Sequence, residues 1–145
     1  MGGKVPDTYL INTEFSYTDV QLDVVTTNKG NNSNAVVLVC QSTDSGWYEF
    51  DVSNSGTYAI YAVNASGYNE LDSGNSKSIK AGLSTNLYTA ICKGTELSLS
   101  INGDAVTSIT DSSFNFSSGN IGIGVSSLQG LPVDVFIESL KVSQP

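Results

Sequence analysis

The chain has 145 residues, a length that predicts one domain with room for a sizeable hydrophobic core. It carries six lysines, no arginine and no histidine against 14 acidic residues, for a formal net charge of −8. Without histidine there is no Ser-His-Asp triad, no Cys-His pair and no imidazole metal ligand, and a negative chain without arginine is a poor partner for nucleic acid or for an anionic membrane.

Hydropathy and composition suggest an exported protein. The longest apolar run, 35–40, is far below the ~20 residues of a spanning helix, so we predict no membrane insertion. No signal peptide is visible, because the first residues lack an apolar segment. Met-Gly-Gly at 1–3 is typical of an expression start, so we expect these residues to be a remnant of expression. We predict that residues 4–145 form a single domain, which can be one module of a larger parent. Only 14% of residues are charged, and a Ser-, Thr-, Asn- and Gly-rich surface is typical of extracellular or cell-surface all-β modules.

The first part of the chain predicts one alternating strand and one central strand. Residues 4–18 have the composition of a polar lead-in. Residues 19–24 alternate apolar and polar side chains, which predicts a half-buried strand. After a polar loop, residues 35–41 are apolar on both faces, which favours a strand in the middle of a sheet.

A hairpin follows, and its register can be derived from the pattern. If Phe50 of the strand 46–52 lies opposite Ile60 of the strand 56–62, the apolar residues of both strands face the same way. These residues should form core. The opposite face then carries Trp47, Glu49, Asp51, Ala59, Tyr61 and Val63.

The second half of the chain predicts a run of short strands and no helix. Residues 64–85 are expected to be mostly loop, with one short strand near 76–79. Asn-Gly at 102–103 predicts a tight hairpin. The parity of the apolar residues changes between Ile137 and Leu140, which predicts a β-bulge near 138–139. The strands expected in this half are 86–92, 96–101, 105–110, 119–125 and 133–142.

The order of these motifs resembles the laminin-G-like, concanavalin A-like jelly rolls, and more closely the bacterial extracellular domains related to the keto-disaccharide hydrolase type. The resemblance covers roughly residues 15–145 and implies an all-β, jelly-roll β-sandwich of two antiparallel sheets. Two positions depart from the family pattern: Gln41 stands where Arg is frequent, and 137–139 replace a Phe-Asp-Asn corner. The motifs that carry the resemblance are Tyr88–Gly94, Leu97–Gly103, Ser118–Gly124 and Val135–Val142.

Glucanases of the laminarinase type on this fold place two glutamates and an aspartate on one strand. Glu49 and Asp51 match the first two carboxylates of that pattern, but Ser53 and Asn54 stand where the second glutamate belongs. Retaining hydrolysis needs two carboxyl groups about 5 Å apart. We therefore predict no catalytic residue and no enzymatic activity, and a glycoside-active enzyme is kept as the last alternative.

The aromatic and acidic face of the hairpin predicts a ligand site. Trp47 and Tyr61 can stack on sugar rings, while Glu49 and Asp51 accept hydrogen bonds from sugar hydroxyls. The leading hypothesis is a non-catalytic extracellular binding module for a glycan or cell-surface polymer on the concave face. The alternative for the aromatic residues is that Trp47 is packed under a loop and Tyr61 is an ordinary strand residue. The alternative for Glu49 and Asp51 is a pair of solvated carboxylates. The functional alternative is a structural or adhesion subunit that self-assembles into a filament or surface layer, with self-association through strand edges.

Two further sites remain as expectations. Cys40 and Cys92 are the only cysteines, and we predict that they form a disulfide, with two buried thiols as the alternative. No cofactor is predicted, but the resemblance leaves calcium open, with solvated turn aspartates as the alternative. The acidic residues that qualify by type are Asp44, Asp72, Asp104, Asp111 and Asp134.

Overall fold

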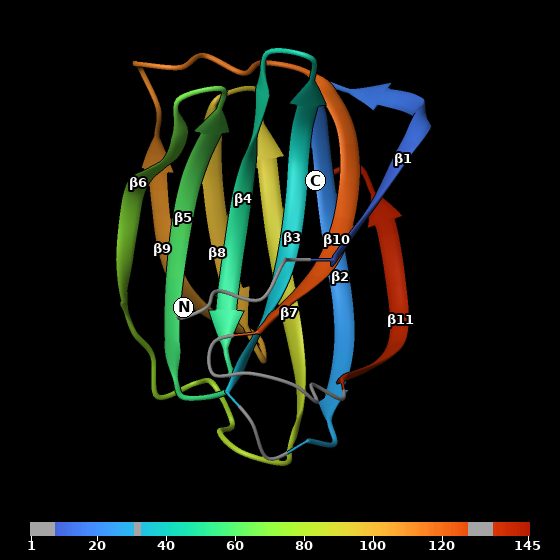
Figure 1. Ribbon diagram of the computed structural model, residues 1–145, viewed down its shortest axis with the longest axis vertical. Helices are drawn as coiled ribbons and strands as arrows, with labels where there is room; N and C mark the ends of the chain where they lie inside the picture. Colours follow the sequence, from blue (N-terminus) through green and yellow to red (C-terminus); the bar gives the residue numbers. More distant parts are fainter. Residues whose placement is uncertain (1–7, 31–32, 128–134) are drawn as a thin grey trace.

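The computed structural model describes residues 8–30, 33–127 and 135–145, and within them the chain forms eleven β-strands and no helix that could cross a membrane. The strands form two antiparallel sheets packed face to face (Figure 1), as predicted. The six-stranded sheet contains, in order, β1 (Thr8–Tyr17), β10 (Gly119–Ser127), β3 (Asn34–Thr43), β4 (Gly46–Ser53), β5 (Thr57–Asn64) and β6 (Gly67–Asn75). The five-stranded sheet contains β11 (Val135–Ser143), β2 (Asp19–Asn28), β7 (Thr85–Lys93), β8 (Glu96–Ile101) and β9 (Asp104–Thr110).

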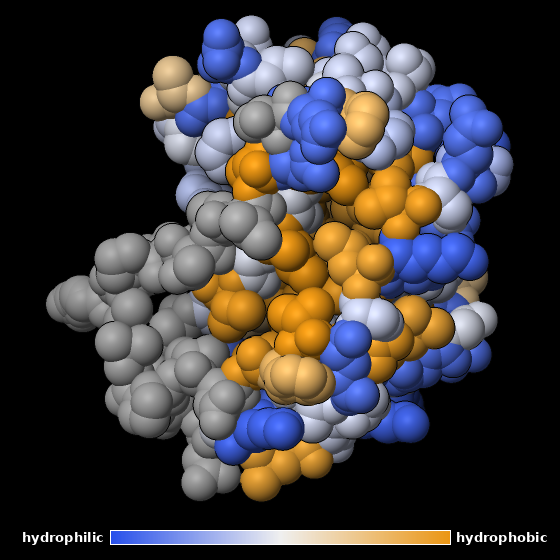
Figure 2. Space-filling model, turned by 90° about the vertical axis from the view of Figure 1, so that its right-hand side faces the viewer, coloured by the Kyte–Doolittle hydropathy of each residue, from blue (hydrophilic) through white to orange (hydrophobic). Residues whose placement is uncertain are grey.

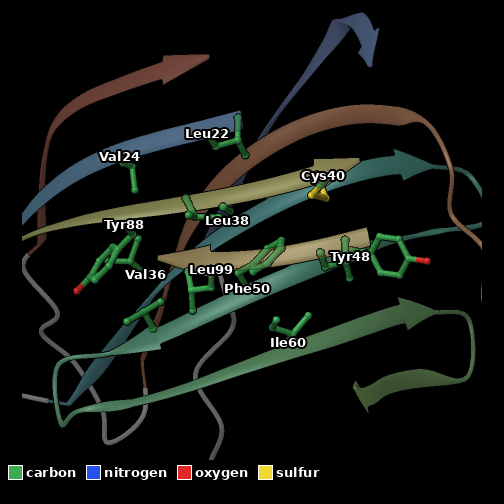
Figure 3. Close-up of a cluster of buried hydrophobic side chains, with 14 of the residues drawn as sticks. Leu22, Val24, Val36, Leu38, Cys40, Tyr48, Phe50, Ile60, Tyr88 and Leu99 are labelled. Atoms are coloured by element: carbon green, nitrogen blue, oxygen red, sulfur yellow. A yellow bond between two sulfur atoms is a disulfide. The ribbon is translucent and has the colours of Figure 1, made fainter. Parts of the chain in front are cut away.

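The core lies between the two sheets and is built by alternate residues of each strand. In β2 the burial alternates residue by residue, so Leu22 and Val24 point inward while their neighbours are half-buried. Leu99 of β8 points inward from the same five-stranded sheet, and Phe50 and Ile60 face these residues from the six-stranded sheet (Figure 3). Strand alternation therefore gives each sheet one apolar face, and burying these faces against each other drives the packing.

The register of the central hairpin is confirmed. Phe50 lies opposite Ile60 in the β4–β5 pair. β3 is buried on both faces, because Val37 and Val39 are 0% exposed although they point away from the core. The six-stranded sheet is therefore covered at its centre on the outer face as well.

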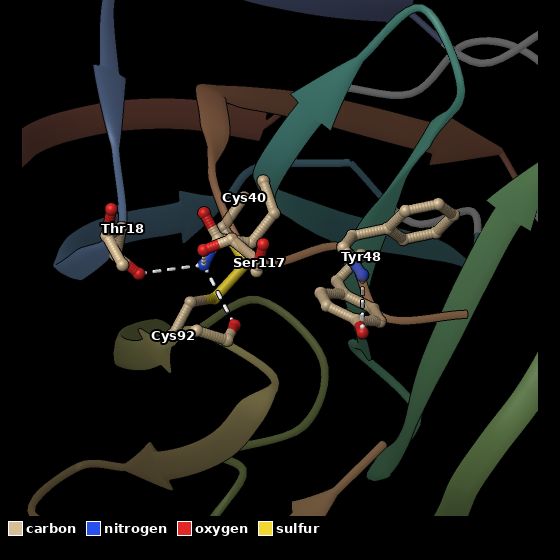
Figure 4. Close-up of a disulfide and its surroundings, with 8 residues drawn as sticks. Thr18, Cys40, Tyr48, Cys92 and Ser117 are labelled. Carbon is tan, nitrogen blue, oxygen red and sulfur yellow. Dashed lines mark hydrogen bonds between the residues drawn. A yellow bond between two sulfur atoms is a disulfide. The ribbon is translucent and has the colours of Figure 1, made fainter. Parts of the chain in front are cut away.

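A disulfide joins the two sheets. Cys40 of β3 is bonded to Cys92 of β7, with the Cα atoms 6.6 Å apart (Figure 4). The neighbouring Gln41 is fully buried and adopts a positive φ of 54°. Its Nε2 donates hydrogen bonds to the carbonyl oxygens of Thr18 and Gly94, both at 2.9 Å. A third, longer bond runs to the Ser117 carbonyl oxygen at 3.4 Å, so Gln41 ties four chain segments together at the position where the resemblance expected an arginine.

Two edge strands contradict the sequence-based expectations. Residues 8–17 form β1 instead of a lead-in, and residues 67–75 form β6 instead of a loop. The short strand expected at 76–79 is wrong, since these residues form a turn. An edge strand has one hydrogen-bonded neighbour and tolerates polar, exposed side chains, so its composition resembles that of a loop.

The bulge predicted in the last strand is confirmed. The β11–β2 register shifts between Ile137 and Ser139, which leaves Glu138 as the extra residue. The expected start of this strand at 133 and 134 lies outside the described residues. The bulge keeps both Ile137 and Leu140 on the inward face, opposite Thr26 and Val24.

Candidate functional site

The four residues predicted to bind a ligand lie on one face of the structure. Trp47, Glu49 and Asp51 are alternate residues of β4, and Tyr61 of β5 lies directly opposite Glu49. Because the side-chain period of a strand is two, all four point to the outer face of the six-stranded sheet. The structure therefore brings together the set that the hairpin register predicted.

Glu49 is buried, and the alternative of a solvated carboxylate at this position is wrong. The residue is 0% exposed, and its Oε1 accepts a hydrogen bond from Trp47 Nε1 at 3.1 Å. A buried carboxylate needs hydrogen bonds to offset the loss of water. Glu49 therefore fixes the orientation of the half-buried indole, which defines one end of the site.

A small hollow lies beside this pair on the same face. Its volume is about 120 Å³, well below the roughly 300–1,000 Å³ of pockets that enclose a drug-sized ligand. Asp51 supplies a carboxylate to it and Tyr61 an aromatic ring. The hollow is lined by Ala35, Asp51, Ser53, Thr57, Tyr58, Ala59 and Tyr61.

The face around Tyr61 is acidic. Burial raises the pKa of the Tyr61 phenol above its ordinary value, and the charges of Asp51, Glu70 and Glu49 raise it further. The side chain stays protonated at neutral pH, so its hydroxyl can donate a hydrogen bond as well as accept one.

Sequence reasoning missed two members of this surface. Glu70 lies opposite Tyr61 in the β5–β6 pair, and the Tyr68 ring meets the Tyr61 ring edge to face at 5.5 Å between centroids. Both belong to β6, which the composition had suggested to be loop. Tyr68 and Glu70 are two residues apart, so they share one face of a strand. Pairing that strand with β5 in the sequence analysis would have placed both side chains beside Tyr61.

The strand that carries Glu49 and Asp51 does not complete a glucanase pattern. Ser53, near the place of the second glutamate, is buried, and its hydroxyl oxygen accepts a hydrogen bond from the Ser55 amide at 3.0 Å. Asn54 occupies the other position at which the glucanase pattern can have its second glutamate. Its side-chain oxygen accepts a hydrogen bond from the Asn34 amide. Neither can act as an acid or base.

Three of the aspartates considered for calcium have other roles. Asp111 is buried and accepts hydrogen bonds from the Tyr48 hydroxyl at 2.5 Å and from the amides of the loop 113–115. Burial by itself would raise the pKa of Asp111, but these hydrogen bonds lower it below its ordinary value. Asp72 and Asp104 accept from the hydroxyls of Thr107 and Ser78.

Within the described ranges no three acidic or cysteine side chains are arranged to hold a metal ion. Asp44 lies exposed in the turn between β3 and β4, and Asp134 lies outside the described residues. Calcium binding therefore stays a prediction that rests on the resemblance alone.

Comparison with known proteins supports the fold. The chain matches no family model and no curated protein sequence. Among solved structures it is similar to the carbohydrate-binding module CBM66 from Bacillus subtilis, with a TM-score of 0.76 and 14% identity over 95% of this chain and 82% of that one.

Two further structures extend the likeness. A sheep galectin-11 complex with glycerol has a TM-score of 0.64 and 8% identity over 96% of this chain and 99% of that one. A family 16 glycoside hydrolase from Bacteroides ovatus has a TM-score of 0.68 and 11% identity over 93% and 74%. At these identities the likeness shows the fold alone, which is a jelly-roll β-sandwich of two antiparallel sheets.

Proposed function

We propose that this protein is a non-catalytic carbohydrate-binding module whose site is the outer face of β4 and β5. The observation that carries the proposal is the hollow walled by Tyr61 and Asp51, on the same face as an indole that Glu49 holds in place further along β4. An aromatic ring beside a carboxylate is the combination that sugars require, because a pyranose has apolar C–H faces and a rim of hydroxyl groups.

The size of the hollow indicates how the ligand binds. A volume of about 120 Å³ accepts part of one sugar ring and does not enclose a chain of several units. Tyr61 would stack on the ring, Asp51 would accept from adjacent hydroxyls, and Trp47 would contact the neighbouring unit. Few polar contacts and a shallow surface predict modest affinity.

Three observations support the remaining parts of the proposal. The titles of the similar structures name a carbohydrate-binding module and galectins. The Cys40–Cys92 disulfide is typical of proteins outside the reducing cytosol, which supports an extracellular or cell-surface location and a glycan or surface polymer as partner. The missing second carboxylate on β4 supports a binding role over hydrolysis, even though family 16 enzymes share the fold.

The proposal is tested with a panel of neutral glycans and three variants. Trp47 is the only tryptophan, so its fluorescence should change on binding and give a dissociation constant directly. Tyr61→Ala and Asp51→Asn should each weaken binding about tenfold or more, as loss of an anchor residue does. Phe136→Ala removes an aromatic side chain that is 52% exposed on the other sheet and should leave binding unchanged.

Two results would contradict the proposal. One is the absence of binding to every glycan in the panel by titration calorimetry as well as by fluorescence. The other is binding that survives Tyr61→Ala, which would place the site elsewhere. Release of new reducing ends from a bound polysaccharide would overturn the non-catalytic part alone.

A further inference from the structure

Strand β11 is a free edge of the five-stranded sheet. It pairs with β2 on one side, and no strand in the described part of the chain pairs with its other side. Phe136, Leu140 and Val142 on this strand are 52%, 41% and 37% exposed. An edge with unpaired amides and carbonyls next to apolar side chains is a template for another strand.

The sandwich is open along this edge. Leu140 and Val142 lie opposite Val24 and Leu22, which are buried core residues, so all four point toward the space between the sheets. A groove of about 360 Å³ remains between β11 and the other sheet, and Figure 2 shows apolar side chains gathered on this side of the molecule. Its walls are Ile11, Asn12, Ile121, Gly122, Ile123, Leu140 and Val142.

The bulge sorts the side chains of β11 into two rows. The inward row holds Ile137, Leu140 and Val142. On the outward row Glu138 accepts a hydrogen bond from the Thr27 hydroxyl, and Lys141 lies opposite Asp23. Both charged residues are exposed. The edge therefore presents an apolar row toward the groove and one charge of each sign toward solvent.

We propose that the partner of this edge is β11 of a second copy of the chain, paired antiparallel about a two-fold axis at Leu140. In this register Leu140 lies opposite Leu140 of the second copy, and Ile137 lies opposite Val142 of the second copy. The bulged pair at 138–139 then lies opposite Lys141 of the second copy, which is the two-against-one arrangement of a β-bulge. The two-fold axis repeats each contact, so the interface contains two Glu138–Lys141 pairs.

Charge and apolar pattern select this register over its neighbours. A two-fold axis at Lys141 would place two lysines directly opposite each other, which is destabilising. An axis at Val142 would place Lys141 opposite Ser143 and leave both charged residues without a complement. Of these three registers, only the one at Leu140 matches apolar with apolar on the inward row and acid with base on the outward row. A lysine on an edge strand ordinarily discourages pairing, and here it gains a carboxylate in trans.

The association is expected to be weak and to need salt. Two copies with a net charge of −8 each repel at long range, but at about 0.15 M salt the Debye length is only about 8 Å, so the close pairs at the edge persist. Pairing through one strand also buries little area, which is typical of weak interfaces. This dimer is independent of the glycan site, which lies on the other sheet. A two-fold dimer is closed, so assembly into a filament or surface layer would need a second contact.

The experiment is sedimentation equilibrium on the full chain over a wide range of protein concentrations. Lys141→Glu and Glu138→Lys each turn two attractive pairs into repulsive ones and should weaken the dimer about tenfold or more. The double variant Glu138→Lys/Lys141→Glu restores opposite charges and should restore the dimer. Lys77→Glu makes the same change in net charge on an exposed turn far from β11 and should leave the dimer unchanged.

Three outcomes would overturn the proposal: a monomer at every concentration, a dimer that Lys141→Glu does not weaken, or a dimer that Lys77→Glu weakens equally.

Because Glu138 also accepts a hydrogen bond from Thr27, the circular dichroism spectrum and melting temperature of each variant must match the wild type. Lys141→Gln, which removes the charge without reversing it, gives an intermediate effect if the register is right. Binding of a foreign peptide without a dimer would also count against the proposal.

Discussion

The outer faces of the two sheets are built from similar strands and have different environments. On the five-stranded sheet, Asp23 of β2 is half-buried and accepts hydrogen bonds from Thr89 and Gln21. On the six-stranded sheet, Glu49 and its neighbour Val39 are both 0% exposed. One face is therefore an ordinary solvated surface, and the other is buried at its centre.

This difference changes what a carboxylate does on each face. Water can replace the partners of Asp23, so its hydrogen bonds contribute little net stability. Glu49 has lost water and depends on groups such as the Trp47 indole. The buried face is thus the one on which polar groups are held in fixed positions, which is a property of binding sites.

The largest effect should come from removing the bond that joins the two sheets. Cys40→Ala/Cys92→Ala opens a loop with a sequence separation of 52, and the chain-entropy model gives a loss of about 4 kcal/mol in the free energy of unfolding. Urea denaturation measures it. Wild type unfolded under a reducing agent should show the same loss, and a loss below about 1 kcal/mol would mean that packing alone holds the sheets together.

The second-largest loss of stability should come from the loop that connects β9 of the five-stranded sheet to β10 of the six-stranded sheet. Asp111→Asn keeps the shape but removes the charge that accepts from Tyr48 and from the amides of 113–115, and it should cost about 2–3 kcal/mol at pH 7.

The pH dependence of this cost follows from the lowered pKa of Asp111. A carboxyl group whose pKa is lower in the folded protein contributes stability above its unfolded pKa of about 3.9 and loses it as the pH falls through the folded value. The difference between wild type and Asp111→Asn should therefore shrink between pH 5 and pH 2. A difference that stays constant over that range would show that the charge of Asp111 does not matter.

The sequence predicted the centre of the fold well. Alternation in 46–52 and 56–62 determined the β4–β5 register, and that register alone placed Trp47, Glu49 and Tyr61 on one face. The change of parity around Glu138 predicted the bulge. The register and the bulge could be predicted because one buried face requires apolar residues at every second position, so the apolar pattern determines the pairing.

The sequence did not predict the two edge strands of the six-stranded sheet or the burial of the site. β1 and β6 have one partner strand each, so hydrogen bonding to that partner, and not a local apolar pattern, makes them strands. Tyr68 and Glu70 were missed for this reason. The complete burial of Glu49 could not be derived either, because a period of two shows which face a residue is on and not what covers that face.

A matched pair of valines measures the difference between the two outer faces directly. Val39→Ala on the six-stranded sheet removes two methyl groups from a fully buried position and should cost about 2 kcal/mol. Val25→Ala makes the same change at a half-buried position on β2 and should cost less than about 1 kcal/mol. Denaturant midpoints for the two variants check this, and equal costs would mean that the faces do not differ energetically.

The smallest effect separates burial from charge at two tyrosines. Burial raises the pKa of Tyr88, on the inner face of the five-stranded sheet, to about 12, even though a hydrogen bond with Thr26 lowers it. At Tyr61 burial also comes first, but the charges of Asp51, Glu70 and Glu49 add to the shift. A nearby carboxylate disfavours the phenolate, so Asp51→Asn should lower the pKa of Tyr61 and leave that of Tyr88 unchanged. Tyrosine-resolved NMR titration measures both values. If Asp51→Asn does not move the pKa of Tyr61, then the charge of Asp51 does not act on the Tyr61 hydroxyl, and the two side chains that line the hollow are not electrostatically coupled.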